Sequence, residues 1–536
     1  MAAPLLAQTP PDAGVLRQQI ERETGTRLPP RGAPLKPVET APLSLPGGVT
    51  VTVKEFRFAG NTLLASASLA PVVAPWLNRP LGLAELEEAA AAVANAYREA
   101  GWIVRTYLPR QDVTDGIVTI QIVEAAFGGA RIEGSPPSRV RPDTILAFIE
   151  ARQKKGEPIN AAVLDRSLLL ADDLPGIALS GSLAAGRNEG ETDLVLKVTD
   201  EPLFAGEVSA DNSGSRSTGN KRASVIGYLN SPLGLGDQLR GNVLHSEGSD
   251  YAWLDYSLPV GANGWRIGIN ASYLDYRLVA PEFRALHGSG DSTSFGLQAN
   301  YALIRSRESN LYLSVAYADK RFHNEANNAV QSDYRIDSLA LGLSGNLFDR
   351  LGGGGANSYS VTWFTGKLNQ GSRDVGENPA LAGHFHKLQY ALSRQQAITD
   401  EQSVYLSLSG QHASRSLDSS ERFYLGGATG VRAYPVNEGG GSRGELASAE
   451  WRVRLPAGLV VSPFYDHGHI ANFDGGPAYS LKGYGLAVAW ATPLRVGVKL
   501  TWARRIGNNP KPTATGADQD GSLHRNRFWL SVSLPF

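Results

Sequence analysis

The residues best suited to chemistry lie in the segment SPFYDHGHI, residues 462–470. His467 and His469 are two positions apart, so in a strand both imidazoles would share one face and could bind one metal ion, with Asp466 on the other face. No third ligand is evident near them, and a protein zinc site needs at least three. The sequence therefore predicts no metal site and no cofactor.

A serine nucleophile is the second possibility. The segment GGSRG (440–444) matches G-x-S-x-G, a pattern that exposes a serine where a strand turns into a helix. Here it lies in a glycine-rich loop that follows no apolar strand, which indicates a chance match. The glycine runs at 352–355 and 439–441 precede neither G-K-[ST] nor a helical pattern, so they predict loops rather than phosphate cradles. We therefore predict no catalytic residue.

Composition excludes further classes. The 51 Lys and Arg residues balance 52 Asp and Glu residues, so no basic field indicates nucleic acid as a partner. The absence of cysteine rules out disulfides, thiolate metal sites and a cysteine nucleophile, and fits an oxidising compartment. The longest uncharged stretch, residues 58–78, is interrupted by Pro71 and Pro75, so no membrane-spanning helix is predicted. The first residues form no complete secretory signal, and we expect an exported form to have lost it.

The N-terminal region predicts a helix on a tether. Residues 11–27 have a narrow apolar stripe of Val15, Leu16 and Ile20, and a helix this short is marginal in water without a docking surface. Six prolines in residues 28–48 predict an extended linker that reaches on the order of 60 Å. We therefore assign residues 1–27 to the helix and 28–48 to the linker. A disordered tail is the alternative.

Two units of the same element order follow, at residues 49–125 and 126–201. Each predicts strand, helix, helix, strand, strand over about 75 residues, which indicates tandem small α+β domains. The expected elements are strand 49–59, helices 63–76 and 83–100, strands 103–108 and 117–124, then strand 127–133, helices 141–153 and 160–173, and strands 177–184 and 192–199.

From residue 202 to 536 the pattern alternates with the period of a strand. Residues 265–273 place Trp, Ile, Ile, Ala and Tyr on one face and Arg, Gly, Asn and Ser on the other. A soluble sandwich would alternate too. Strands long enough to cross a bilayer, a Gly-, Ser- and Arg-rich second face and aromatic residues near strand ends favour a transmembrane antiparallel β-barrel. At roughly 20 residues per strand and connection, the region holds about 16 strands.

Specific motifs add a resemblance to this outline. The segments 97–124, 164–177, 211–219 and 231–239, together with VRAYP (431–435), resemble the two-partner secretion (TpsB-type) transporters of the outer-membrane assembly-factor superfamily. The small domains of that family are called polypeptide-transport-associated, or POTRA, domains. The family usually has glycine where this chain has Ala433, and a positive φ at that position would be costly for alanine.

The resemblance implies roles for named residues. Val431, Arg432, Ala433, Tyr434 and Pro435 would form a functional motif on a long sixth extracellular loop that folds back into the barrel. Arg432 would pair with Asp466 on the lumen wall, because a guanidinium can engage a carboxylate with two parallel hydrogen bonds. Phe536 would be the C-terminal assembly signal, and the N-terminal helix would plug the pore.

The function implied is an outer-membrane pore, with its POTRA-like domains in the periplasm, that recognises and translocates a cognate large exoprotein of the adhesin, haemolysin or toxin type without ATP. The expected partners are a secreted exoprotein with an N-terminal secretion domain, outer-membrane lipids and, during biogenesis, the barrel assembly machinery. An insertase of the same superfamily and, less favoured, an outer-membrane enzyme are the alternatives.

Overall fold

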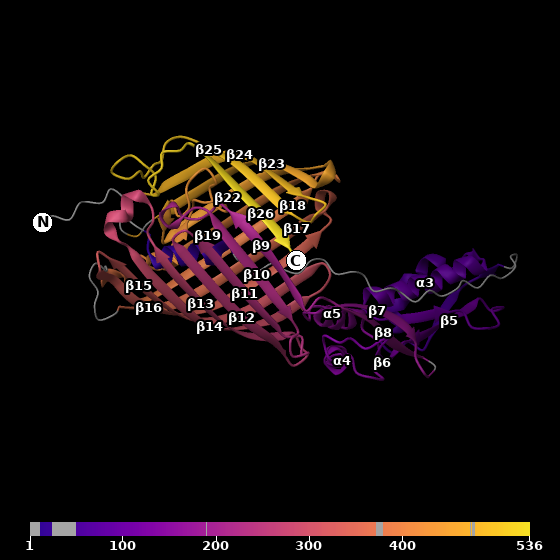
Figure 1. Ribbon diagram of the computed structural model, residues 1–536. Helices are drawn as coiled ribbons and strands as arrows, with labels where there is room; N and C mark the ends of the chain where they lie inside the picture. Colours follow the sequence, from indigo (N-terminus) through magenta and orange to yellow (C-terminus); the bar gives the residue numbers. More distant parts are fainter. Residues whose placement is uncertain (1–10, 24–49, 189, 371–378, 472, 474–476) are drawn as a thin grey trace.

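The computed structural model describes residues 11–23, 50–188, 190–370, 379–471, 473 and 477–536. A closed barrel makes up the larger part of the chain, and two small α+β domains extend from one of its ends (Figure 1). The predicted linker at 28–48 and both ends of the predicted N-terminal helix lie outside the described residues. No helix among the described residues is long and apolar enough to cross a membrane.

The first α+β domain has a three-stranded sheet in the order β2-β5-β4, with a parallel β2–β5 pair. Its elements are β1 (Val51–Thr52), β2 (Glu55–Ala59), α2 (Ser66–Val73), a 3-10 turn (Ala74–Trp76), β3 (Pro80–Leu81), α3 (Leu83–Glu99), β4 (Val104–Tyr107) and β5 (Ile117–Glu124). The single first strand predicted at 49–59 is wrong. A bend at Lys54 divides it, because Lys54 and Glu55 both donate their backbone N–H to Gly116, and β1 pairs with β3 instead.

The core of this domain lies between α3 and the sheet. Ala89, Ala90, Val93 and Tyr97 of α3 are buried against the sheet. The Tyr97 hydroxyl reaches Glu124, which also accepts backbone hydrogen bonds from residues 62 and 63. Burial opposes ionisation of Glu124, but hydrogen bonds from Thr62, residue 63 and Tyr97 outweigh it and lower the pKa of this carboxyl.

The second domain repeats this architecture with the sheet order β6-β8-β7. Its elements are β6 (Ala126–Ile132), α4 (Pro142–Glu150), α5 (Ala161–Asp172), β7 (Ile177–Ala185) and β8 (Glu191–Asp200). Asn160 caps α5 by accepting hydrogen bonds from two backbone N–H groups of its first turn. The two domains are joined by backbone hydrogen bonds between residues 103 and 159 and between 161 and 101.

The barrel contains sixteen described antiparallel strands, which confirms the fold class and the strand number expected from the sequence. They are β9 (Phe204–Asp211), β10 (Arg222–Asn230), β11 (Gln238–Ser246), β12 (Ser249–Val260), β13 (Trp265–Arg277), β14 (Ser289–Arg305), β15 (Ser309–Ala326), β16 (Ala329–Asp349), β17 (Gly355–Gln370), β18 (Gly383–Ala397), β19 (Gln402–Ala413), β22 (Arg443–Leu455), β23 (Leu459–Ala471), β24 (Tyr479–Ala491), β25 (Gly497–Arg505) and β26 (Asn526–Pro535). β26 pairs with β9 and closes the barrel, so the large sheet has no free edge.

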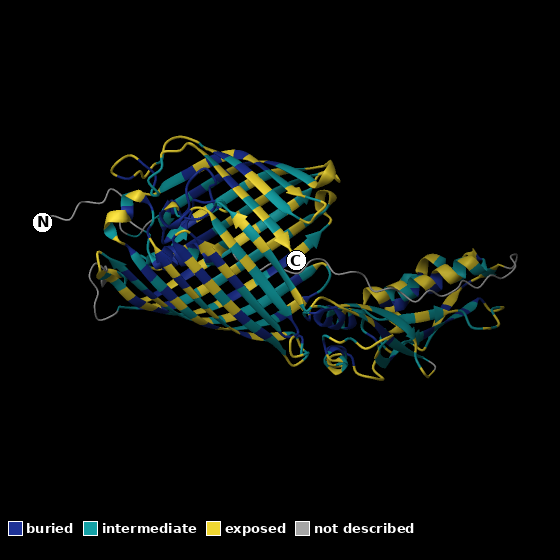
Figure 2. Cartoon of the chain, in the orientation of Figure 1, coloured by how far each residue is buried: buried dark blue, intermediate teal, exposed yellow. Residues whose placement is uncertain are grey.

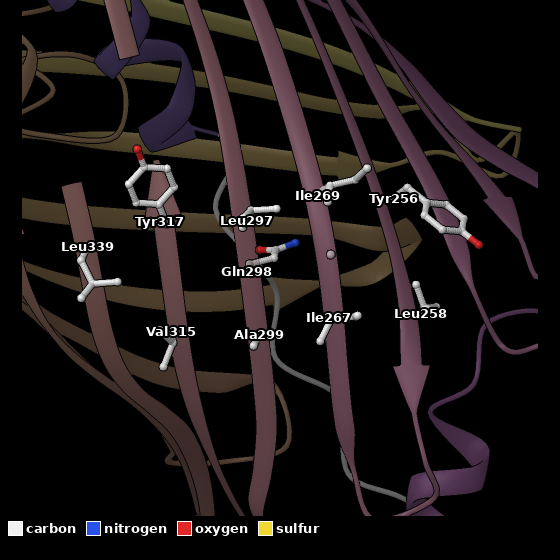
Figure 3. Close-up of a pocket in the computed structure, with 11 residues that line it drawn as sticks. Tyr256, Leu258, Ile267, Ile269, Leu297, Gln298, Ala299, Val315, Tyr317 and Leu339 are labelled. Carbon is white, nitrogen blue, oxygen red and sulfur yellow. The ribbon is translucent and has the colours of Figure 1, made fainter. Parts of the chain in front are cut away.

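The two faces of the strands differ as the alternation predicts, and Figure 2 shows buried and exposed residues alternating around the wall. On β13, Ile267 and Ile269 are 43% and 50% exposed, whereas Gly268 between them is buried. A hollow of about 510 Å³ lies on this outer apolar face between residues of β12 to β16, including Leu297, Val315 and Leu339 (Figure 3). It is a gap between outward apolar side chains, the kind of surface that lipid acyl chains cover.

The second domain is docked on three turns of the barrel, at the end we call the domain end. Arg305 at the end of β14 donates two hydrogen bonds to Asp173, of 2.7 and 2.8 Å, and Arg307 pairs with Asp165 of α5. Leu174 packs where a Cβ on Gly236 would stand 2.5 Å from its side chain, and Gly236 has φ +74°. The β10–β11 turn therefore requires glycine for conformation and for space.

We expect Arg305→Ala to loosen this docking. The Arg305 side chain is 3% exposed, so its hydrogen bonds to Asp173 are worth about 1.5–3 kcal/mol. Amide hydrogen exchange in α5 of the full-length protein should rise by about tenfold or more. Arg335→Ala, which removes an ion pair with a 45% exposed arginine on β16, is the matched control. Unchanged exchange in the Arg305 variant would contradict the docking role.

Candidate functional site

A long connection between β19 and β22, residues 414–442, folds into the barrel from the end opposite the domains. It contains the 3-10 helix Ser419–Glu421 and a short hairpin of β20 (Phe423–Tyr424) and β21 (Gly440–Gly441). We call this connection the inner loop. Most of its residues are buried, including all of the predicted motif: Val431, Arg432, Ala433, Tyr434 and Pro435.

Arg432 holds the tip of the inner loop against the wall. Its Nε and Nη2 donate to the two oxygens of Asp466 at 2.9 and 2.7 Å, and its backbone N–H donates to the same carboxylate at 3.1 Å. Asp466 lies on β23, is fully buried and also accepts from the Ser448 hydroxyl at 2.8 Å. The structure thus brings together the two residues that the resemblance pairs, in the bidentate geometry that suits arginine.

A second carboxylate, which the sequence reasoning missed, completes this site. Glu450 on β22 accepts from Arg432 Nη1 at 2.8 Å and, through its other oxygen, from Arg452 at 2.8 and 2.9 Å. Cross-strand pairing places Ser448 beside Asp466 and Glu450 beside Phe464, so the four side chains form one patch. The Arg432 guanidinium lies 3.4 Å from the centre of the Phe464 ring, in the range of a cation–π contact.

The other motif residues fit the tip into the wall. Trp529 of β26 donates its indole N–H to the Arg432 carbonyl at 2.8 Å, and the Tyr434 ring lies beneath the Arg505 guanidinium. Ala433 is not among the residues with positive φ, so the conformational cost expected for it does not arise. Its size matters instead, because a Cβ on Gly483 of β24 would stand 2.6 Å from the Ala433 Cβ. A larger side chain at 433 would push the tip off the wall.

The N-terminal helix α1 (Ala13–Glu23) lies inside the barrel, against β13 to β15 and the inner loop. Its apolar residues Leu16 and Ile20 join a buried cluster with lumen-facing residues such as Tyr276, Phe322 and Tyr334. Glu23 pairs with Arg222 at 2.8 Å, and Arg222 with Asp211. The docking surface that such a short helix needs is therefore the barrel wall.

The same helix is fastened to the inner loop. Arg22 donates to the Tyr424 carbonyl at 2.7 Å, and Gln18 donates to the Arg422 carbonyl. At its start, Asp12 accepts from the Ser419 hydroxyl at 2.6 Å. Helix and loop are therefore in contact with each other inside the barrel.

The structure also describes the serine and the two histidines that the sequence offered as candidates for catalysis and metal binding. The Ser442 hydroxyl, in the G-x-S-x-G match, accepts a hydrogen bond from the backbone of Leu417. His467 and His469 lie on the opposite face of β23 from the buried Asp466. Among the described residues no group of three or more His, Asp or Glu side chains is arranged to hold a metal ion.

Phe536 closes the seam of the barrel. Its backbone N–H donates to the Gly206 carbonyl at 2.9 Å, and its carbonyl accepts from the Gly206 N–H at 3.0 Å. The side chain is 63% exposed on the outer face, and its ring covers Gly206, where a Cβ would stand 2.4 Å from it. It extends the five β26–β9 residue pairs by one more contact.

We expect deletion of Phe536 to reduce the amount of folded barrel more than Phe536→Ala does. Deletion removes two backbone hydrogen bonds, worth about 1 kcal/mol each, as well as the ring, whereas alanine keeps the backbone. The measurement is the fraction of membrane-extracted protein that keeps the fast mobility of a folded barrel in a gel run without boiling. Phe536→Tyr is the control. Equal folding of the unchanged protein, the deletion and both substitutions would contradict an assembly role of Phe536.

Known proteins with the same combination of a barrel and small α+β domains are similar to this chain in sequence. The family described as haemolysin secretion/activation protein ShlB/FhaC/HecB matches residues 190–490, and the POTRA domain of ShlB type matches residues 51–125. The heme/hemopexin transporter protein HuxB of Haemophilus influenzae strain 86-028NP is 25% identical, over 99% of this chain and 96% of its own length. The outer membrane transporter CdiB of Dickeya dadantii is 25% identical, over 83% of this chain and 81% of its own.

A solved structure shows the same fold. CdiB from Escherichia coli superimposes with a TM-score of 0.72 at 22% identity, covering 94% of each chain. Because the family match spans more than half of the residues, and the barrel, the α+β domains and the inner loop occur in one chain, the assignment does not depend on a single motif. The chain belongs to the haemolysin secretion/activation family ShlB/FhaC/HecB, the outer-membrane transporters of two-partner secretion.

Proposed function

We propose that this chain exports one cognate large exoprotein, of the adhesin, haemolysin or toxin type, from the periplasm to the cell surface without ATP. The barrel lies in the outer membrane and its domain end faces the periplasm. The observation that supports export best is the inner loop, which folds into the lumen and is held to the wall there by Arg432. HuxB is named as a heme/hemopexin transporter and HpmB as a hemolysin transporter, and a secreted protein is accordingly the partner we propose here.

The proposed division of labour follows the chain. Residues 1–27 plug the pore, 28–48 tether the plug, 49–125 and 126–201 receive the unfolded exoprotein, and 202–536 conduct it. α1 leaves the lumen, the inner loop shifts, and the exoprotein passes through in extended form. Its folding outside would bias motion outward. Outer-membrane lipids cover the apolar outer face, and the barrel assembly machinery inserts the chain.

We further propose that the chain has no catalytic activity of its own. Its family consists of transport proteins. The one serine in a nucleophile-like pattern, Ser442, uses its hydroxyl to accept a hydrogen bond from backbone N–H, and no histidine among the described residues is hydrogen-bonded to that hydroxyl.

The test is co-expression with the product of a neighbouring gene for a large β-helical exoprotein. The full chain should release that product at the cell surface. A variant lacking residues 49–200 should not, although its barrel still inserts. Retention of the exoprotein by cells with the full chain, together with a loss of other barrel proteins when the chain is deleted, would indicate an insertase instead.

A further inference from the structure

The outer wall of the barrel has a row of cationic and imidazole side chains near the end opposite the domains. The row crosses the seven neighbouring strands from β17 to β25 (Figure 1). Four of its members are Lys or Arg: Lys367, Arg443, Lys482 and Arg504. Five of the nine histidines of the chain lie among them: His384, His386, His412, His467 and His469. We call these nine residues the outer cation band.

Strand alternation places the band on the lipid side of the wall. On β18, Lys387 is buried toward the lumen, whereas His384 and His386, at the alternate positions, are exposed. Residues that pair across neighbouring strands have their side chains on the same face, about 5 Å apart. Three such pairs each join a cation and an imidazole: Lys367 with His384, Arg443 with His412, and Lys482 with His467.

The band has an excess of positive charge. The same strands carry one outward carboxylate at this end, that of Glu445, which accepts a hydrogen bond from the Tyr390 hydroxyl at 2.8 Å. Lys367, Lys482 and Arg504 make no ion pair with any described residue. With all histidines neutral, the four cations and one carboxylate leave three net positive charges.

The neighbouring sector, from β12 to β16, has the opposite sign at the same end. Its outward face has three arginines and seven carboxylates: Arg277, Arg321 and Arg335, and Asp250, Asp275, Asp291, Asp319, Glu325, Asp333 and Asp337. Asp337 lies opposite Lys367 where the two sectors meet, but it is paired with Arg335 at 2.9 Å. The positive charge is therefore a property of one side of the barrel and not of its whole rim.

A row of aromatic side chains fixes the depth of the band. On β23, β24 and β25 an outward aromatic residue lies two positions nearer the middle of the barrel than the nearest band residue of the same strand: Tyr465, Tyr484 and Trp502. On β17, Trp363 stacks on the His386 ring, with the ring centres 5.7 Å apart. Outward aromatic residues of membrane barrels lie at the membrane–water interface, and two residues of a strand span about 7 Å. Because the domain end faces the periplasm, the band lies at the level of the lipid headgroups of the outer leaflet.

We propose that the outer cation band binds an outer-leaflet lipid whose headgroup contains more than one phosphate group. Ammonium and guanidinium groups form charge-assisted hydrogen bonds with phosphate oxygens, and a neutral imidazole can donate another. Seven strands spaced about 4.8 Å apart extend over roughly 30 Å, which is too wide for a single phosphate. The acyl chains of the same lipid cover the apolar wall beside the band. An acidic soluble protein fits this surface less well, because it would have to displace lipid from that wall.

The band lies on the back of the strands that hold the inner loop. β22 and β23 face the lumen with Glu450 and Asp466, which bind Arg432, and they face the lipid with Arg443 and His467. A lipid whose phosphates bridge neighbouring strands therefore stiffens the part of the wall to which the loop tip is fastened.

The test measures lipid binding to the full-length protein in a non-ionic detergent by native mass spectrometry. The probes are diphosphorylated lipid A and the same disaccharide lipid without its phosphate groups. The double variant Lys482→Gln, Arg504→Gln should bind the diphosphorylated lipid at least about tenfold more weakly, because it loses charge-assisted hydrogen bonds, and should bind the phosphate-free lipid as before. Lys482→Gln alone should show a smaller loss and replaces the double variant if that protein does not fold. Inorganic phosphate at the concentration of the lipid should not displace it.

Arg277→Gln, Arg321→Gln is the matched control, because it removes two exposed arginines from the acidic sector at the same end. It should leave binding of the diphosphorylated lipid unchanged. Equal binding of both lipids by the unchanged protein, an equal loss in both double variants, or displacement by inorganic phosphate overturns the proposal. In intact cells, a photo-activatable phenylalanine derivative in place of His386 should cross-link to a phosphorylated lipid, and a cross-link to a protein instead would rule out the lipid as occupant.

Discussion

Arg432→Ala is expected to abolish release of the exoprotein while the barrel still inserts and folds. The substitution leaves the fully buried Asp466 without its guanidinium, and breaking a buried ion pair costs about 3–5 kcal/mol. That is roughly a hundredfold or more in the ratio of docked to undocked loop tip. The sixteen-stranded ladder does not depend on this contact, so the loss falls on the loop and not on the barrel.

The measurement is exoprotein in the medium, relative to folded transporter recovered from the outer membrane. Arg321→Ala is the control, since that arginine of β15 is 68% exposed and its ion pair with Asp319 is 3.6 Å long. Normal secretion by the Arg432 variant would remove the role that we assign to the motif.

Substitutions of the residues that contact Arg432 should impair secretion in proportion to the number of hydrogen bonds that each one removes. Asp466 accepts three hydrogen bonds from Arg432, whereas Glu450 accepts only one from Arg432 and is also hydrogen-bonded to Arg452. We therefore expect Asp466→Ala to impair secretion nearly as much as Arg432→Ala, and Glu450→Gln to impair it less.

The fold was more predictable from the sequence than the side-chain contacts of the candidate site were. Strand alternation is a local property, because apolar side chains recur at every second position on the outward face, and it was sufficient to predict the barrel. The strand number followed from the length of the region, at roughly 20 residues per strand and connection. The bend at Lys54 was missed although the apolar positions change from odd to even across it, from Val51 and Val53 to Phe56 and Phe58. Its cause is a backbone contact with Gly116, 62 residues further along.

The site depended on information that periodicity does not carry. The pairing of Arg432 with Asp466 came from the resemblance of two motifs. Glu450 belongs to no such motif, and an acidic residue on the polar face of a strand has the same pattern whether it faces water or a guanidinium. Only the register of β22 against β23, with Glu450 opposite Phe464, brings it to the loop tip.

Removing the plug should have an equally large effect, on conductance rather than on secretion alone. Deletion of residues 1–27 is expected to convert a closed or flickering pore into one with a steady large current in planar bilayers. Leu16→Ala should raise the conductance by a smaller amount. Leu16 is 3% exposed in a cluster with lumen residues, and its truncation costs about 2 kcal/mol or more of helix docking. That corresponds to roughly a thirtyfold larger population of undocked helix.

The complementary variant locks the plug in place. The Asp12 carboxylate lies 2.6 Å from the Ser419 hydroxyl, and the chain has no cysteine of its own, so the pair Asp12→Cys and Ser419→Cys offers one clean cross-link between helix and inner loop. Oxidised, this protein should neither conduct nor secrete, and reduction should restore both, while each single variant stays active under either condition. Secretion by the fully cross-linked protein would show that cargo passes without expelling α1, and would place the route along the β17–β25 wall beside a stationary helix.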